Sequence, residues 1–513
     1  MLMPITFFII LYQFCFSVCS TETNISQTIW KRLSPVCATI PVRVKVDPSA
    51  VVFNVDSRFY SIGQGASLSF VFRHNLSNPV LKLFAKELAP AYFRVGGTKS
   101  NFLVFCDDEE VCEDGPGYSN ITFSGKVWDE INTFVKDAGW NLVFTVNAFL
   151  RTPDNKWDPS NLIKLLEYSS KRGYKLDFEL GNEPNAYFHK FNKTITPEQN
   201  AEDFKSFKAI LKQYNNYQDS LLIGPDVTAM VKYETYKPLL GMKADKYLSS
   251  FLDNVGDTID VTSSHFYYCD HKDHVMPSNF TSLQILDIFS RNAKTLRRLV
   301  HQHRPSGKYR TWIGESGDVA GGGLKNFSDR FASGMVWLDK LGIGALNDIE
   351  VFIREVFLDD GRGLIDPDIF PHVDYWSAVL FRRLVGKETL KVSYTQSTLE
   401  LKRLRLYAHC TRTAGSSYHY QPGAVTIFGV NFNKEETVEL LLDVGDIDQF
   451  LLTPVRPNNI LSRYGALNGV ELALNNGSVP EMSPQPVVGN PIMPQGSMGF
   501  FVLKNADFKI CKS

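Results

Sequence analysis

The stretch Leu176-Asp177-Phe178-Glu179-Leu180-Gly181-Asn182-Glu183-Pro184 places a carboxylate directly after a short apolar run. A second apolar run, Tyr309 to Gly314, is followed at once by Glu315. Short apolar runs bounded by turn residues are typical of buried strands. Barrels of alternating strands and helices collect their functional groups at the C-terminal ends of the strands. The pattern therefore predicts a β/α barrel with Glu183 and Glu315 at its rim.

Strand-like and helix-like runs alternate from about residue 60 to residue 385, which predicts βαβ units and a parallel sheet. A doubly wound open sheet is the alternative to a closed barrel, but no G-x-G-x-x-G motif opens a helix. The predicted strands are Ala91–Val95, Leu142–Asn147, Leu176–Gly181, Leu221–Pro225, Ile259–Tyr267, Tyr309–Gly314 and Ile349–Ile353, with an eighth near Phe59–Gly63.

Beyond Leu390 the runs become short and period-two, separated by Gly, Pro and Asn, which predicts an antiparallel β-sandwich. The early run Val42–Asn54 has the same character. We therefore expect an α/β protein, a (β/α)8 TIM barrel with a second antiparallel β-sandwich domain. The predicted parts are a signal peptide at 1–20, a segment at 21–55 that adds strands to the sandwich, a catalytic barrel at 56–388 and the sandwich at 389–513.

The N-terminus has the features of an exported protein. The apolar run Ile5–Val18 is too short for a membrane span and ends in small residues, as in a secretory signal; a buried N-terminal helix is the alternative. We expect a secreted or lysosomal protein without a membrane span. Glycosylation motifs begin at Asn24, Asn75, Asn120, Asn192, Asn279, Asn326 and Asn476.

Six cysteines remain once the signal is removed, and export favours disulfides among them. We expect Cys106 to pair with Cys112 and Cys410 with Cys511, although spacing alone does not fix the pairing and leaves Cys37 and Cys269 open. Scattered cysteines without a C-x-x-C motif argue against zinc. The sequence predicts no metal and no cofactor.

The charge balance excludes partners that need a strong global field. Formal net charge is −1, so we expect neither nucleic-acid binding nor polyanion binding by the whole surface. An acidic substrate would have to be recognised in a local cleft. We expect the protein to be a monomer. Basic clusters are solvated faces or, if one lines the cleft, a sulfate site; they lie at Arg297-Arg298, Arg304 to Arg310, Arg382-Arg383 and Lys402 to Arg405.

Two glutamates at strand ends suit a retaining glycosidase, which needs a protonated acid and an ionised nucleophile roughly 5–5.5 Å apart. Pro184 disfavours helical geometry at Glu183 and predicts an extended rim position. A salt-bridged loop glutamate is the alternative for either residue taken alone. Glycines 321–323 follow Glu315 and predict a substrate-binding loop that includes Gly322 and Gly323.

Other polar residues at strand ends extend the predicted site. Tyr267, which closes His265-Phe266-Tyr267, could donate its hydroxyl to the nucleophile, or could pack in the core. Asp56 and the turn from Arg94 to Thr98 could contact sugar hydroxyls, and Arg94 could equally be a structural ion-pair partner. The side-chain amide of Asn182 could also hydrogen-bond a sugar hydroxyl.

Several segments, in order over most of the chain, resemble the heparanases and related β-glucuronidases. They are Ala89–Lys99, Glu179–Asn185, Gly224–Val227, Trp312–Ser316, Gly321–Gly323, Met335–Gly342 and Asp374–Trp376. The resemblance implies a barrel with a β-sandwich that cleaves β-glucuronide bonds of heparan sulfate with retention. It assigns Glu183 as proton donor, Glu315 as nucleophile and Tyr267 as its support. Asp56, Thr98 and Asn182 match substrate contacts, and Cys410 and Cys511 match a family disulfide.

Three segments depart from that pattern. Between Lys99 and Asn141 there is only a short acidic loop in place of the long excised segment of vertebrate heparanases, which predicts a single-chain protein. The residues after Val227 include fewer basic side chains than the matching segment of vertebrate heparanases. The loop Asp359–Gly363 is shorter and more acidic at the place where a uronate carboxylate is expected.

The sequence therefore predicts a retaining endo-β-glucuronidase acting by double displacement on heparan sulfate or a related glucuronate-containing glycan. An exo-β-glucuronidase on non-sulfated glycans is one alternative. A catalytically silent heparan-sulfate-binding protein is another.

Overall fold

A computed structural model describes residues 39–66, 76–107, 121–231, 242–273, 276–304, 307, 309–359, 361–443, 445–475 and 477–512. The predicted signal peptide lies outside these residues. So do Cys37, Cys112, His274 and the glycosylation motifs at Asn24, Asn75, Asn120 and Asn476. Among the described helices, none is both long and apolar enough to cross a membrane.

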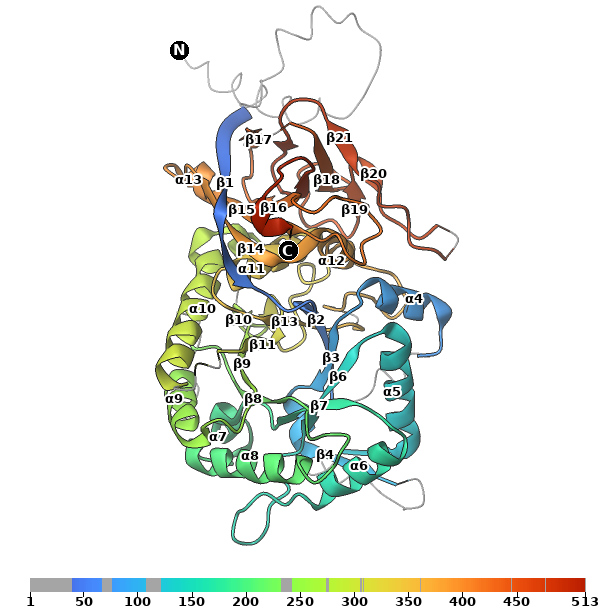
Figure 1. Ribbon diagram of the computed structural model, residues 1–513, viewed down its shortest axis with the longest axis vertical. Coiled ribbons are helices and arrows are strands. Elements are labelled where there is room, and N and C mark those ends of the chain that lie inside the picture. Colours follow the sequence, from blue (N-terminus) through green and yellow to red (C-terminus); the bar gives the residue numbers. More distant parts are fainter. Residues whose placement is uncertain are drawn as a thin grey trace, which may run out of the picture. The chain divides into compact units, whose positions relative to one another are not determined.

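Eight parallel strands close into a barrel, with the last strand pairing back onto the first (Figure 1). This confirms the predicted closed barrel over the open sheet. In barrel order the strands are β2 (Tyr60–Gly65), β3 (Tyr92–Gly96), β6 (Asn141–Val146), β7 (Leu176–Leu180), β8 (Leu222–Val227), β9 (Val261–Phe266), β11 (Thr311–Ser316) and β13 (Val351–Glu355).

Each barrel strand is followed by a helix that packs on the outside of the barrel, as the alternating sequence pattern predicts. Helix α5 shows local signals for both of its ends, because Ser124 caps its N-terminus and Gly139, at φ 73°, ends it. The eight helices are α4 (Pro79–Glu87), α5 (Gly125–Ala138), α6 (Ser160–Lys171), α8 (Pro197–Leu211), α9 (Ala244–Val255), α10 (Leu283–His303), α11 (Phe331–Ala345) and α12 (Val373–Leu384).

Short elements at the strand ends shape the rim. After β7 come a 3-10 turn, η2 (Pro184–Ala186), and the short helix α7 (Tyr187–Phe191). After β3 lie η1 (Thr98–Phe102), β4 (Leu103–Cys106) and β5 (Ile121–Ser124). Beyond β9 and β11, the strands β10 (Cys269–Asp270) and β12 (Val319–Ala320) pair with each other; the turn η3 (Pro277–Thr281) precedes α10.

The barrel interior changes from apolar to polar along its axis. One layer is a buried apolar cluster of Tyr92, Val143, Ile223, Val261, Trp312, Val351 and Ile353. Because side chains on a strand alternate between its two faces, the residue two positions further points inward as well. Those positions hold Arg94, Thr145, Ser263 and Glu355, all buried. The barrel is thus filled by apolar packing below and by charged and hydroxyl groups nearer the rim.

The second domain is a sheet of eleven strands, mainly antiparallel as predicted; ten of them form one continuous hydrogen-bonded path, and β21 pairs with β18 off this path. The early segment β1 pairs with β14 antiparallel and with β17 in parallel. The strands are β1 (Thr39–Asn54), β14 (Val385–Tyr394), β15 (Leu404–Thr411), β16 (Val425–Asn431), β17 (Thr437–Leu442), β18 (Ile447–Pro454), β19 (Gly465–Leu467), β20 (Val470–Glu471), β21 (Gln485–Val487), β22 (Ile492–Met493) and β23 (Ser497–Leu503).

Both faces of this sheet are buried. Phe428 and Phe500 belong to the core shared with the barrel helices, whereas Ile427 and Phe501, their neighbours in sequence, belong to a separate core on the other face. At the first face the Tyr407 hydroxyl donates to Asp339 of α11 at 2.6 Å. The expected disulfide between Cys410 and Cys511 is present and ties the end of the chain to β15.

Candidate active site

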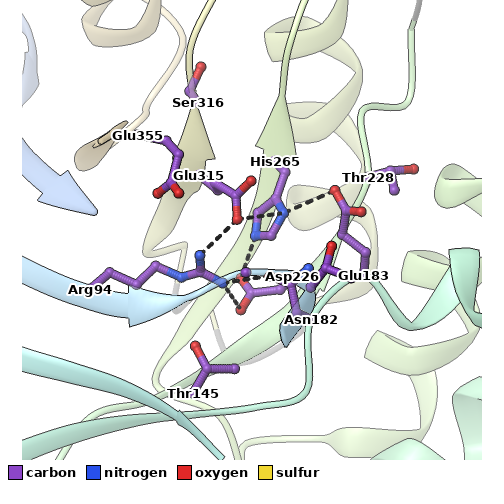
Figure 2. A network of polar contacts seen from close by, with 12 residues as sticks. Arg94, Thr145, Asn182, Glu183, Asp226, Thr228, His265, Glu315, Ser316 and Glu355 are labelled. Carbon is purple, nitrogen blue, oxygen red and sulfur yellow. Dashed lines mark hydrogen bonds and ion pairs between the residues drawn. The ribbon is translucent and has the colours of Figure 1, made fainter. Parts of the chain in front are cut away.

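A cleft opens at the C-terminal ends of the barrel strands, and it brings together Glu183, Glu315, Tyr267 and Thr98. Figure 2 shows Glu183 and Glu315 on either side of His265. The described residues that line the cleft are Thr98, Glu183, Lys190, Thr228, Ala229, His265, Tyr267, Tyr268, Cys269, Asp270, Glu315, Ala320 and Gly321.

Glu183 is held by an unusual backbone conformation. Its φ and ψ are both 57°, in the left-handed region, and its N–H donates to the Asp226 carbonyl at 3.0 Å. The prediction of an extended backbone at this residue was wrong: the proline excludes the right-handed helical region, and tertiary contacts select the left-handed one. Gly181, at φ 72°, begins this turn, and a Cβ there would lie 2.3 Å from the Tyr187 hydroxyl.

His265 lies between the two predicted catalytic carboxylates. Its Nδ1 is 3.2 Å from Glu183 Oε1 and 3.9 Å from Glu315 Oε2, and its Nε2 is 3.6 Å from Asp226 Oδ1. Burial alone would lower the pKa of His265, but Glu315, Asp226 and Glu183 outweigh burial and raise it to about 10. His265 is therefore an imidazolium at neutral pH, shared by three carboxylates.

Arg94 forms the floor beneath these groups. Its side chain is fully buried, and Nη1 contacts Glu315 Oε2 at 3.0 Å while Nε contacts Glu179 Oε2 at 2.8 Å. The remaining nitrogen donates to Asn182 Oδ1 at 3.0 Å. Of the two interpretations of Arg94, the structure therefore selects the ion pair, since its guanidinium is occupied by protein groups.

Glu315 is held in its ionised form. Burial alone would raise its pKa, but the charges of His265 and Arg94 outweigh burial and keep the pKa below its usual value. The Tyr267 hydroxyl also donates to Oε1 at 2.8 Å, in the geometry expected of a supporting tyrosine. A buried, ionised carboxylate with a fixed orientation is suited to nucleophilic attack.

Glu183 is also held in its ionised form, contrary to expectation. Burial alone would raise the pKa of its carboxyl, but Lys190 and His265 outweigh burial and lower it. Lys190 Nζ lies 2.5 Å from Glu183 Oε2. The expected separation of the two pKa values is therefore absent, because a lysine of α7 neutralises the predicted proton donor.

Two further buried carboxylates have raised pKa values. Burial, reinforced by Asp226, raises the pKa of Glu179 to about 8 against the opposing charge of Arg94. Burial and the charge of Glu315 raise that of Glu355 to about 7. Both carboxyls therefore hold a proton more readily than an exposed glutamate does.

The other predicted contacts are only partly brought to the cleft. Thr98 Oγ1 accepts from Lys190 at 3.3 Å, and Gly321 lines the cleft. At Gly322 a Cβ would meet open space, whereas at Gly323 a Cβ would lie 2.9 Å from the Ser328 side chain and 3.0 Å from the Arg362 Cβ. Gly323 therefore makes room for the loop after β13.

Asp56 lies at the opposite end of the barrel, so its predicted contact with substrate was wrong. It precedes β2, and its carboxylate accepts from the Arg58 backbone at 2.7 Å and side chain at 3.0 Å. Its own N–H donates to the carbonyl of Glu350, which precedes β13. Parallel strands place residues that precede them at the N-terminal end, away from the rim.

The basic clusters of the sequence do not line the cleft among the residues the structure describes. Arg297 pairs with Asp348, Arg383 with Glu87 and Arg405 with Asp287. Arg304 is buried and donates to the Ile259 carbonyl at 3.1 Å. Three of the four clusters thus have an arginine paired with a carboxylate that does not line the cleft.

The sequence analysis missed three residues of the site: His265 and Lys190, which line the cleft, and Glu355, which is buried close to Glu315. A signal existed for His265 and Glu355, because each is a charged side chain at an inward position near the end of a buried strand. Lys190 lies on a five-residue helix and has no comparable signal.

Comparison with known proteins gives consistent results. Residues 65–342 match the N-terminal domain of glycosyl hydrolase family 79. The chain is 33% identical to a heparanase of Mus musculus, over 89% of this chain and 92% of the mouse protein. It is 30% identical to a hyaluronoglucuronidase of Hirudo nipponia, over 92% and 99% of the two chains. A solved 4-O-α-L-rhamnosyl-β-D-glucuronidase of Fusarium oxysporum has the same fold, with a TM-score of 0.64, 14% identity, and 90% and 100% of the chains covered.

Proposed function

Because this chain belongs to glycosyl hydrolase family 79 and is a glycosidase, we propose that it is a retaining endo-β-glucuronidase acting on heparan sulfate. The observation that carries the proposal is the pair Glu183 and Glu315, which share the His265 imidazole at the rim. Glu183 Oε1 lies 3.2 Å and Glu315 Oε2 lies 3.9 Å from His265 Nδ1. The two carboxylate oxygens can be no further apart than the sum of these distances. That limit is compatible with the close carboxylates of a retaining enzyme.

In the first step Glu315 attacks the anomeric carbon while the bond to the glycosidic oxygen breaks. Glu183 gives its proton to that oxygen, and the leaving sugar departs as an alcohol. A glycosyl ester of Glu315 remains. In the second step water attacks the same carbon, Glu183 takes a proton from the water, and the ester bond breaks to regenerate Glu315.

The buried polar network orients these groups. Tyr267 and Arg94 each bind one oxygen of Glu315, which fixes the plane of the nucleophile. Positive charge from His265 and Arg94 keeps it ionised before attack. Such fixed charges need no rearrangement during the reaction.

An acidic sugar requires a cation near the nucleophile, and Arg362 is suited to that role. Its ion pairs to Glu355 and Asp359 are long, at 3.7 and 3.8 Å, and its Nε has no hydrogen-bond acceptor among the described residues. The shortened loop therefore offers a guanidinium that can bind a planar carboxylate by two hydrogen bonds. This supports a uronate as the sugar that Glu315 attacks.

The proposal is tested by incubating the purified protein with heparan sulfate at mildly acidic pH and sizing the products by gel filtration, with Glu315→Gln as the control. Mid-size fragments that the control does not produce are the expected result. Early products observed by proton NMR should carry the β-anomer. Release of free glucuronate from chain ends would indicate the exo enzyme, and retention on heparin without cleavage would indicate a binding protein.

We also propose that the protein is secreted or lysosomal. The disulfide between Cys410 and Cys511 supports this, since such bonds persist in oxidising compartments. Detection of the protein in the medium of expressing cells, with size reduction on removal of N-linked glycans, would test it.

A further inference from the structure

The shortest contact in the cleft joins Lys190 to Glu183, the proposed proton donor. Its Nζ lies 2.5 Å from Glu183 Oε2 and donates to Thr98 Oγ1 at 3.3 Å. The side chain comes from α7, which begins four residues after Glu183. It lines the cleft and is 29% exposed.

This contact opposes the reaction, because a proton donor must carry a proton and a neighbouring ammonium favours the ionised carboxylate. The charged groups that face Glu183 are Lys190 from α7, His265 from β9 and Glu315 from β11, with Arg94 and Asp226 beneath them. Asp270 of β10 adds a negative charge near Lys190. A change in one of these charges must accompany productive binding of substrate.

Only one of the two cations that contact Glu183 can be drawn away by a ligand. His265 is 1% exposed and bound by three carboxylates, so its position is fixed. Lys190 carries its charge on a flexible side chain that reaches the open cleft. Because Glu183 must touch the leaving oxygen, the ammonium beside it lies on the side of the leaving sugar.

We propose that Lys190 is a specificity-determining residue that binds a sulfate on the leaving sugar and in doing so gives up its contact with Glu183. The inference rests on the proposed function, since it requires Glu183 to be the proton donor. Binding of the sulfate moves the positive charge from the carboxylate to the substrate. Glu183 then takes up a proton from solvent and holds it against the glycosidic oxygen.

This mechanism selects substrates through turnover as well as through binding. A substrate that lacks the sulfate leaves Lys190 on Glu183, so that little of the bound enzyme carries the required proton. The pH profile of kcat reports groups in the enzyme–substrate complex. Its alkaline limb should therefore lie higher for the sulfated substrate than for the unsulfated one.

The test uses two tetrasaccharides that differ only in a sulfate on the glucosamine that leaves, with the full-length enzyme and Lys190→Met. A matched control is Lys193→Met, since Lys193 lies three residues away and its Nζ sits over the Phe149 ring at 4.5 Å. Lys190→Arg keeps the cation and serves as the conservative variant. Thermal unfolding of each variant checks that it is folded.

In the unmodified enzyme we expect kcat for the sulfated substrate to be about tenfold higher, with its alkaline limb about one pH unit higher, since one unit corresponds to tenfold. In Lys190→Met both differences should vanish, and the alkaline limb of kcat/KM for the unsulfated substrate should rise. Lys193→Met should behave like the unmodified enzyme, and Lys190→Arg should retain the preference for sulfate.

Two results would overturn the inference: an unchanged preference for sulfate in Lys190→Met, or an equal fall of kcat on both substrates without a shift of the alkaline limb. Failure of the proposed function looks different. In that case Glu183→Gln would keep full activity, or the unmodified enzyme would cleave neither tetrasaccharide.

Discussion

Both ends of the barrel carry arginines paired with carboxylates, but only the C-terminal end is arranged for chemistry. At the N-terminal end Asp56 pairs with Arg58, and Arg310 pairs with Glu350 at 2.9 Å. Each of these two carboxylates has its own arginine. At the rim a single arginine, Arg94, serves several carboxylates at once.

The contrast shows that ion pairs alone do not mark an active site. At the rim the charges share partners, Glu183 and Asp226 have left-handed backbones, and several buried polar atoms have no hydrogen bond within the described part of the chain. Unsatisfied groups and strained backbone are retained where a ligand completes the network. Asp56 lacks these features. Its position at a strand end led to the wrong prediction that it contacts substrate.

The largest expected difference between the two ends comes from removing one arginine from each. Arg94→Met leaves buried carboxylates without a counter-charge, which should cost about 3–5 kcal/mol of unfolding free energy and abolish measurable cleavage. Arg310→Met removes a partly exposed pair, which should cost about 1 kcal/mol or less and leave kcat within about twofold. Denaturant unfolding and heparan sulfate cleavage measure both. Equal losses of stability would contradict the distinction.

The second prediction concerns His265, which lies between Glu183 and Glu315. In His265→Gln the positive charge between Glu183 and Glu315 is lost, so the pKa of each carboxyl should rise and Glu315 should be a poorer nucleophile. We expect kcat to fall about 10³-fold, within the range for groups that control protonation in catalysis. The acid limb of the pH profile should move to higher pH. A pure loss of stability with an unchanged pH profile would show a structural role only.

A tyrosine at each end gives the third comparison. Tyr267→Phe removes the hydroxyl that stabilises ionised Glu315, and kcat should fall about 10- to 100-fold, consistent with one lost hydrogen bond to a charged group. Tyr92→Phe, beneath the Arg58 guanidinium in the apolar layer, should leave kcat within about twofold. Steady-state rates on one heparan-derived oligosaccharide suffice. Equal effects would mean that Tyr267 acts through packing.

Stability against pH gives the fourth comparison, because each end holds a carboxyl whose pKa is raised, that of the buried Glu355 and that of the half-buried Asp177. Burial is the main cause for both Glu355, at about 7, and Asp177, at about 6. A raised carboxyl pKa stabilises the fold below the unfolded-state value, and that stabilisation is lost as pH rises through the folded value. Glu355→Gln should thus raise the unfolding temperature above pH 7 and change it little near pH 4.5.

For Asp177→Asn the same gain should appear between pH 4 and pH 6, a lower window than for Glu355. Each gain should be at most about 3 kcal/mol, at 1.36 kcal/mol per pKa unit. Thermal scans from pH 4 to pH 8 measure both variants. Gains that do not depend on pH would indicate relief of packing instead.

The smallest effect is expected at Asp56. Asp56→Asn keeps an oxygen to accept from the Arg58 backbone but loses the ion pair, so stability should fall by about 1 kcal/mol. Cleavage of heparan sulfate should be unchanged. A large rise in KM would restore Asp56 to the substrate-binding residues.

Much of the fold could be predicted from the sequence, because strands and helices are specified by local burial patterns. All eight barrel strands overlap predicted strands such as Leu176–Gly181, and the change to period-two runs after Leu390 coincides with the antiparallel sheet. Glu183 and Glu315 were found because each directly follows such a run, and the C-terminal ends of parallel strands converge.

The sequence by itself thus determined the barrel, the second sheet and two carboxylates at one rim, since each follows from periodicity within a few residues. Only the tertiary structure decided which end Asp56 occupies, that Glu183 has a left-handed backbone, and that Lys190 and His265 surround it. His265 and Glu183 are 82 residues apart in the chain. Electrostatic energies act through space over a few ångströms, so protonation is set by neighbours that only closure of the barrel brings together.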